Sequence, residues 1–141
     1  MKKTTFIVLT AIVLFACNKD KNDCAITTAS ISGPYKITAV TYKANAGATE
    51  IDYYNTLFPD ACERDDIYTF NAAGTYQIAD AGIVCTPPGN DDGTWSLTGT
   101  TAMVIDGDAV ILESFDCEKL VIVNTDTQVA GDRLKLTLTR Q

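Results

Sequence analysis

The fold of this chain is decided by one stretch, Asp66-Ile-Tyr-Thr-Phe-Asn-Ala-Ala-Gly-Thr-Tyr-Gln-Ile-Ala-Asp80. Two short runs of alternating apolar and polar residues flank Asn71-Ala-Ala-Gly74. That sequence suits a type I turn closed by a glycine in the left-handed conformation, which is the three-residue hairpin loop. The stretch therefore predicts an antiparallel hairpin in which Phe70 faces Tyr76 and Tyr68 faces Ile78.

This register separates the side chains of the hairpin into a dry face and a wet face. Side chains alternate between faces with a period of two, so a loop one residue shorter would shift one strand and mix the two sets. The segregation supports the three-residue loop. The dry face carries Tyr68, Phe70, Tyr76 and Ile78, and the other face carries Ile67, Thr69, Thr75 and Gln77.

Similar short alternations recur along the chain, separated by clusters of Gly, Pro, Asn and Asp, which is typical of a sandwich or barrel. Short links force antiparallel neighbours, and a sheet of eight twisted strands tends to curl and close. The sequence therefore predicts an all-β domain over 31–141, an eight-stranded antiparallel up-and-down barrel. The expected strands are 35–39, 66–71, 75–80, 94–98, 101–106, 109–115, 118–124 and 133–139.

One longer connection, Glu50–Pro59, breaks this rhythm with an apolar spacing of three to four residues, which indicates a short helix. We expect one short capping helix that covers the open end of the barrel. The alternative is that it presents Tyr53, Tyr54 and Phe58 to a partner. The residues that follow the helical spacing are Ile51, Tyr54, Leu57 and Phe58.

The first seventeen residues describe an export signal. Lys2 and Lys3 precede an apolar run, Phe6–Ala16, that is too short for a transmembrane helix of about 20 residues. The run ends in Leu14-Phe15-Ala16-Cys17, which resembles the lipobox of bacterial lipoproteins. The resemblance implies cleavage before Cys17, diacylglycerol on its sulfur and an acyl chain, such as palmitate, on the new amino terminus. An ordinary secretory peptide that ends near a cysteine is the alternative.

We therefore expect residues 1–16 to be a signal peptide and 17–30 to be the lipidated cysteine and a flexible tether. The polar stretch Asn18–Asp23 is similar to the surface-export signal of Bacteroidetes lipoproteins. The expected location is the bacterial outer membrane, where a lipid anchor at Cys17 holds the domain facing the periplasm or the cell surface.

The four cysteines beyond Cys17 suggest two disulfides in an oxidising compartment, and free buried thiols are the alternative. Cys62 precedes the first strand of the hairpin and Cys85 follows the second. If the ladder continues, the two arrive within about one residue of facing each other. We therefore pair Cys62 with Cys85, and Cys24 with Cys117 by elimination.

Charge and composition exclude several classes of function. The formal charge is −7, and removal of Lys2 and Lys3 leaves 9 basic against 18 acidic residues. Such a surface repels phosphate backbones, so we expect no nucleic-acid partner. The chain has no histidine, so the commonest general base and metal ligand are both missing. We expect no cofactor and no enzymatic activity.

The acidic motifs have plain structural explanations. Asp65-Asp66 beside Glu63 resembles a hydrolytic acid pair, but such pairs are too common to identify an enzyme without a cleft. Asp91-Asp92 and Asp106-Gly107-Asp108 lack the spacing of a calcium loop and suit turns instead. We therefore predict no catalytic residue and no metal site.

Several motifs recur in the order expected of one family: Gly33-Pro34-Tyr35-Lys36-Ile37, Cys62-Glu-Arg-Asp-Asp66, Tyr68-Thr-Phe70, Gly74-Thr-Tyr76, Cys85, Gly93-Thr-Trp95-Ser-Leu97 and Leu136-Thr-Leu138-Thr-Arg140. Together they resemble the small lipocalin-like domain of Bacteroidetes lipoproteins over about residues 30–140. The resemblance implies an eight-stranded barrel and a Cys62–Cys85 bridge, and little about activity. Tyr35 replaces the usual Trp, and Cys24 and Cys117 are extra, which leaves the shape of the barrel mouth open.

The expected function is therefore a binding role without catalysis. The barrel holds a small apolar ligand, or its loops hold an envelope protein. The alternative is a structural or accessory lipoprotein with a filled barrel and no ligand, because eight strands leave room either for packed side chains or for one small molecule. The candidate ligand-lining residues are Tyr35, Ile37, Tyr68, Phe70, Tyr76, Trp95 and Leu97.

Overall fold

The computed structural model describes residues 24–141 of the chain. The predicted signal peptide 1–16, the lipidation site Cys17 and the stretch 18–23 lie outside the described residues. No helix in the described part is long and apolar enough to cross a membrane.

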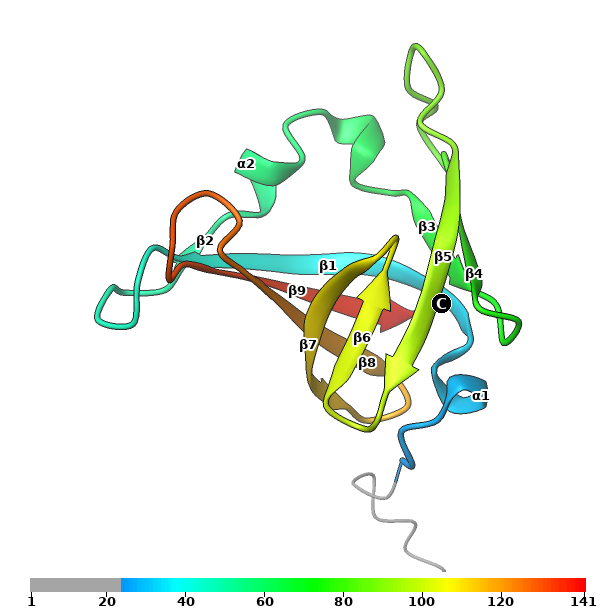
Figure 1. Cartoon of the computed structure of the whole chain (residues 1–141). Coiled ribbons are helices and arrows are strands. Elements are labelled where there is room, and N and C mark those ends of the chain that lie inside the picture. Colours follow the sequence, from blue (N-terminus) through cyan, green and yellow to red (C-terminus); the bar gives the residue numbers. More distant parts are fainter. Residues whose placement is uncertain (1–23) are drawn as a thin grey trace, which may run out of the picture.

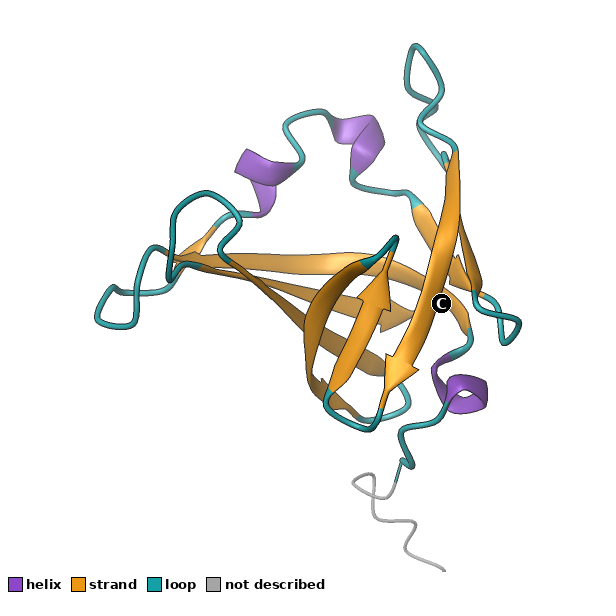
Figure 2. Ribbon diagram, viewed as in Figure 1, coloured by secondary structure: helices purple, strands orange, loops and turns teal. Residues whose placement is uncertain are grey.

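The strands form one antiparallel sheet that closes on itself, because β1 pairs with β9 (Figures 1 and 2). Eight strands make the wall, as predicted, and the short β2 is added beside β1. The strands are β1 Gly33–Lys43, β2 Ile51–Asp52, β3 Ile67–Phe70, β4 Thr75–Ala79, β5 Asp91–Thr98, β6 Ala102–Ile105, β7 Asp108–Phe115, β8 Lys119–Thr125 and β9 Arg133–Arg140. The helical segments are α1 Thr28–Ile31, α2 Tyr54–Leu57 and the 3-10 helix η1 Ala61–Glu63.

The β3–β4 hairpin has the register that the sequence predicts. Phe70 pairs with Tyr76 and Tyr68 pairs with Ile78. The Asn71 N–H donates to the Thr75 carbonyl at 2.8 Å, and Gly74 has a φ of +87°. The glycine is needed there because a side chain rarely tolerates that backbone conformation.

One end of the barrel is closed by α1 and filled with large side chains. Thr27 caps α1 by accepting from the Ser30 N–H at 3.1 Å. The helix thereby places Ile31, which is fully buried, against the barrel core. The same core contains Tyr35 and Trp95, which are 0% and 3% exposed. Packed aromatic and aliphatic side chains thus close this end, although α1 has only four residues.

The segment before β1 is tied to the closed end of the barrel. A disulfide joins Cys24 to Cys117, with 5.6 Å between the Cα atoms, and Cys117 lies between β7 and β8. Cys24 and Ile26 pack against the core. The sequence predicts a flexible tether over residues 24–30, whereas in the structure Cys24, Ile26 and Ile31 attach this segment to the barrel. The sequence feature that indicates this packing is the pair Cys24 and Cys117, because a disulfide between them ties the segment to the barrel.

Helix α2 covers the core where two wall strands diverge. β1 pairs with β3 only through Gly33–Tyr35, and the connection that carries α2 spans the wedge between them (Figure 1). The Tyr54 hydroxyl donates to the Ile37 carbonyl at 3.1 Å, which fixes the helix to β1. Tyr54, Leu57 and Phe58 pack against the core, as the helical spacing predicts.

Ile51 does not belong to that apolar face. It lies in β2, and 51% of its surface is exposed. The helical spacing that included it was wrong at this position because the chain first pairs with β1, where Ile51 faces Tyr42 in the register.

Cys62 and Cys85 form a disulfide with 5.2 Å between the Cα atoms. The ladder of β3 and β4 ends at Ile67 and Ala79, so the bridge does not extend it. It instead joins η1 to the loop that follows β4. The register therefore predicted the correct pair, while the chain reaches it through irregular structure.

Candidate functional site

The barrel contains an apolar cavity of about 140 Å³ in its interior. Its wall comes from five strands, β1, β3, β4, β8 and β9, and from the end of β6. Burial, and after it the nearby Asp66 carboxylate, raise the pKa of the Tyr68 hydroxyl to about 12, so this side chain is neutral in the cavity wall. The lining residues are Ile37, Tyr68, Phe70, Tyr76, Ile78, Ile105, Ile122, Leu136 and Leu138.

Four of the seven candidate lining residues surround this cavity: Ile37, Tyr68, Phe70 and Tyr76. The other three do not. Tyr35 and Trp95 fill the closed end of the barrel, and Leu97 is partly buried against the same core. They belong to the core, as the alternation predicts, but none of them is part of the cavity wall.

Five further residues line the cavity, and three of them lie on stripes that the alternation already marks as dry. Ile78 is on the dry face of the predicted hairpin, and Leu136 and Leu138 are on the dry stripe of the last strand. Only Ile105 and Ile122 come from strands whose alternation is weak. An inward-facing aliphatic residue lines a cavity where the side chains across the barrel leave space, and fills the core where they do not. Those opposite side chains come from other strands, so the pattern of one strand does not predict the outcome.

A second hollow of about 310 Å³ leads outward from the cavity at the end of the barrel opposite α1. The two share Ile105, Ile122 and Leu136 in their walls, so they adjoin each other, and we refer to them together as the recess. The outer hollow adds apolar wall from Val110 and Leu134. Its polar side chains are Asp106, Asp108 and Asn124.

Tyr76 and Asp106 meet at the border between the two hollows. The Tyr76 hydroxyl donates to Asp106 Oδ2, and the Thr94 N–H donates to Asp106 Oδ1 at 2.9 Å. The hydrogen bonds from Tyr76 and Thr94 lower the pKa of Asp106. Burial, and then Asp106, raise the pKa of Tyr76. At neutral pH the pair is therefore a phenol donating to a carboxylate anion.

Gly93 makes room for this pair. A Cβ atom on Gly93 would overlap the Asp106 carboxylate and lie 2.6 Å from a ring carbon of Tyr76. Gly93 faces Tyr76 in the β4–β5 register, which is why the missing side chain matters here. The absence of a side chain on Gly93 thus lets the Tyr76 ring and the Asp106 carboxylate meet in front of it.

The acid pair Asp65-Asp66 holds a loop. Asp65 Oδ2 accepts the Ile83 N–H at 2.8 Å, and Asp66 is 8% exposed beside the same loop. Burial raises the pKa of Asp66, with Asp80 and Asp65 adding to the effect. Neither carboxylate lines the barrel recess. Their position next to the loop after β4 accounts for them as structural residues.

The aspartates considered for calcium are dispersed among turns and strand ends. Asp106 has a φ of +50° in the turn between β6 and β7, and Asp91 begins β5. Among residues 24–141, His, Cys, Asp and Glu side chains form no group of three or more that is arranged to hold a metal ion.

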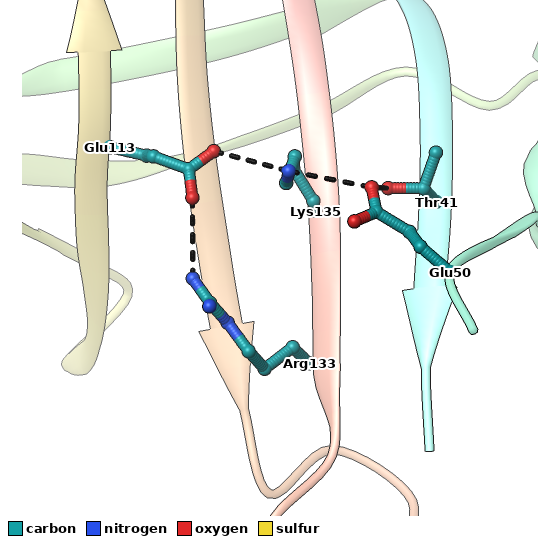
Figure 3. Close-up of polar contacts among 5 residues, drawn as sticks. All are labelled: Thr41, Glu50, Glu113, Arg133 and Lys135. Carbon is teal, nitrogen blue, oxygen red and sulfur yellow. Dashed lines mark hydrogen bonds and ion pairs between the residues drawn. The ribbon is translucent and has the colours of Figure 1, made fainter. Parts of the chain in front are cut away.

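A charged network lies on the outer wall of the barrel (Figure 3). Lys135 bridges Glu50 at 3.4 Å and Glu113 at 3.3 Å, and Arg133 pairs with Glu113 at 3.3 Å. The Thr41 hydroxyl donates to Glu50. The hydrogen bond from Thr41, with help from Lys135, lowers the pKa of Glu50.

This network is best explained as a cover for the sheet. In the register of β8 and β9, Val123 faces Lys135, and Val123 is fully buried although it points to the outer side. Long charged side chains cover apolar surface with their stems while their heads stay in water. The two basic groups are satisfied by two carboxylates, so the network offers no bare charge to a ligand.

The comparisons with known proteins agree with the architecture. Residues 31–127 match a family model described as a lipocalin-like domain. No curated protein matches the chain.

Proposed function

We propose, from the premise that this chain belongs to the lipocalin-like domain family, that it is a non-catalytic binding protein that holds a small apolar ligand in its barrel. The family consists generally of binding proteins rather than enzymes. The observation that carries the proposal is the recess at the open half of the barrel. Its inner cavity of about 140 Å³ has an apolar and aromatic wall.

The size of the inner cavity sets the size of the buried group. An apolar cavity of about 150 Å³ accepts a molecule such as benzene. The outer hollow then leaves room for a second, more polar part of the ligand. The ligand is therefore small: one ring or a short branched chain inside, with a head toward the open end.

The proposal is tested by blocking the cavity. Toluene, titrated into the protein, is expected to quench or shift the fluorescence of Trp95, the single tryptophan, because its ring lies 5.3 Å from that of the cavity residue Phe70. The change Ile122→Phe fills the inner wall and should weaken toluene binding about tenfold or more.

The matched control is Ile111→Phe. Ile111 lies on the neighbouring strand β7, points outward and is 45% exposed, so the same substitution leaves the cavity untouched. Binding is expected to be equal in this variant and the original chain. Absence of any toluene effect, or equal binding by the Ile122→Phe variant, would show that the cavity is not a ligand site.

The second candidate is an accessory lipoprotein with no small ligand, whose loops hold an envelope protein. The observation that favours it is a set of exposed aliphatic side chains on loops at the open end. Ile83 and Val84 are 60% and 61% exposed, and Val129 is 54% exposed. This function predicts that the protein binds a protein partner and that toluene does not change the fluorescence of Trp95.

We also propose that the protein is an outer-membrane lipoprotein of Bacteroidetes type, anchored through Cys17 and facing the periplasm or the cell surface. The lipobox-like sequence supports this location. The first described residue, Cys24, is bound to Cys117 at the closed end of the barrel.

The anchor is tested by Cys17→Ser, with Asn18→Ser as the matched control. Cys17→Ser is expected to move the protein from the membrane pellet to the soluble fraction, because the thiol that receives the lipid is gone. Asn18→Ser should leave it in the pellet. A Cys17→Ser protein that still pelleted in high salt would rule out lipid at this residue.

A further inference from the structure

The recess combines an apolar interior with negative charge at its outer part. Asp106 and Asp108 are the charged side chains in the walls of the two hollows. The lining contains no basic residue. A ligand that occupies both hollows therefore places its outer part beside carboxylates alone.

The strand β9 explains why no base balances these acids. Leu134 and Leu136 point into the barrel, and Lys135 between them points outward. Lys135 and Arg133 are engaged with Glu50 and Glu113 on the outer wall (Figure 3). Alternation thus places the cations on the outer wall, and Asp106 and Asp108 have no basic partner in the wall of the outer hollow.

Asp106 lies where the apolar and polar parts meet. Its partner Tyr76 lines the inner cavity with its ring, and the hydroxyl of that ring donates to the Asp106 carboxylate. A group bound in the cavity against the Tyr76 ring is thus separated from the Asp106 carboxylate by that ring. Val110, Leu134 and Ile105 form the apolar part of the outer hollow's wall beside these acids.

We propose that the ligand is a small organic cation: an ammonium head beside Asp106 and Asp108, carrying one aromatic ring or a short aliphatic group in the inner cavity. This inference rests on the proposed binding function and specifies the ligand class. The acidic character of the whole chain, with a formal charge of −7, favours the approach of such cations.

Three probes with the same ring and different heads test the inference. Benzylamine is a cation at neutral pH, benzyl alcohol is neutral and benzoate is an anion. Calorimetry or Trp95 fluorescence should show benzylamine binding about tenfold or more tighter than benzyl alcohol, and benzoate not binding. The benzylamine affinity should also fall as salt is raised, while that of benzyl alcohol stays constant.

The variant Asp108→Asn removes one charge from an exposed position that makes no structural hydrogen bond in the described residues. It should weaken benzylamine several-fold and leave benzyl alcohol unchanged. Asp92→Asn is the matched control, because Asp92 is exposed and faces Gln77 on the wet side of the sheet. It should change neither affinity.

The outcomes separate the two proposals. If none of the three probes binds, the binding function fails and the ligand class fails with it. If benzyl alcohol or benzoate binds as tightly as benzylamine, or if Asp108→Asn leaves benzylamine binding unaltered, the cavity is a ligand site and the preference for cations is wrong.

Discussion

Gly93 and Asp132 show how single residues in this barrel are constrained for opposite reasons. Gly93 is constrained by what lies in front of it, the Tyr76 ring and the Asp106 carboxylate. Asp132 is constrained by the groups that it binds. It is fully buried, and its carboxylate accepts from the N–H groups of Thr127 and Gln128 at 2.7 and 2.8 Å.

The change Gly93→Ala should lower the thermal midpoint of unfolding. The added Cβ displaces Asp106 or the Tyr76 ring, and overpacking of this kind costs about 1–3 kcal/mol. Differential scanning calorimetry measures the effect. Gly47→Ala is the control, because its Cβ would meet only an ordinary contact, 3.6 Å from Asn45. Equal midpoints for the two variants would mean that the Tyr76–Asp106 pair is not held as the structure has it.

Asp132 makes the stability of the β8–β9 loop depend on pH. Burial opposes ionisation of its carboxyl, but hydrogen bonds from Gln128, Val129 and Thr127 outweigh it and lower the pKa to about 2 from an ordinary value of 3.8. A carboxyl whose pKa is depressed in the folded state contributes stability above the unfolded pKa. That contribution is lost as the pH falls from about 4 toward 2.

The variant Asp132→Asn should therefore unfold at a lower temperature than the original chain at pH 7, and the difference should shrink as the pH approaches 2. Thermal unfolding followed by circular dichroism across this range is the measurement. Asp92→Asn, at an exposed position, should show no such convergence. A gap that stayed constant between pH 7 and pH 2 would contradict the role given to the ionised carboxylate.

At the scale of elements, the closed end is held by a contact between the first helix and the last strand. Arg140 of β9 donates to the carbonyl of Ser32 at 3.0 Å, to that of Ser30 at 2.5 Å and to the Tyr35 hydroxyl at 2.6 Å. Its guanidinium also lies 4.9 Å from the centre of the Tyr35 ring. One side chain thus joins α1, β1 and β9.

The change Arg140→Met should reduce the free energy of unfolding by about 3 kcal/mol, because two carbonyls near the buried core lose a charged donor. Urea denaturation measures it. Arg133→Met on the same strand is the control. Arg133 pairs with Glu113, the two side chains are 45% and 36% exposed, and exposed ion pairs contribute less than about 1 kcal/mol. Similar losses in both variants would show that Arg140 is not the link described here.

The elements also show how far the sequence alone could go. The hairpin register was correct because the dry set Tyr68, Phe70, Tyr76 and Ile78 segregates only in one alignment. Ile51 was misplaced because spacing alone does not distinguish a helical face from a residue that pairs with β1. Propensity and periodicity are local, and a short segment follows whichever neighbour it meets.

The cavity was harder to predict for a reason that belongs to the whole barrel. Tyr35 and Ile37 stand on the same inward stripe of β1, yet the first fills the closed end and the second lines the hollow. What separates them is the presence of α1 and Trp95 at one end and of aliphatic side chains at the other. The interior space is set by the closed sheet, and the side chains that fill it come from all of its strands, so the pattern of one strand does not show where a cavity remains.

The whole molecule is therefore a barrel with two unlike halves. The half next to α1 is packed with aromatic side chains and fastened by Arg140 and the Cys24–Cys117 bridge. The other half contains the recess, with Asp106 and Asp108 at its outer part. This division allows the chain to keep a packed core in one half of the barrel while the other half is hollow.

Xenon bound under pressure in a crystal of the protein would test the hollow half most directly, because xenon enters apolar cavities of about 150 Å³ without needing polar contacts. The account predicts electron density for xenon inside the barrel, among Ile37, Tyr68 and Leu136. A barrel whose side chains fill this space, with xenon absent from it, would contradict the account.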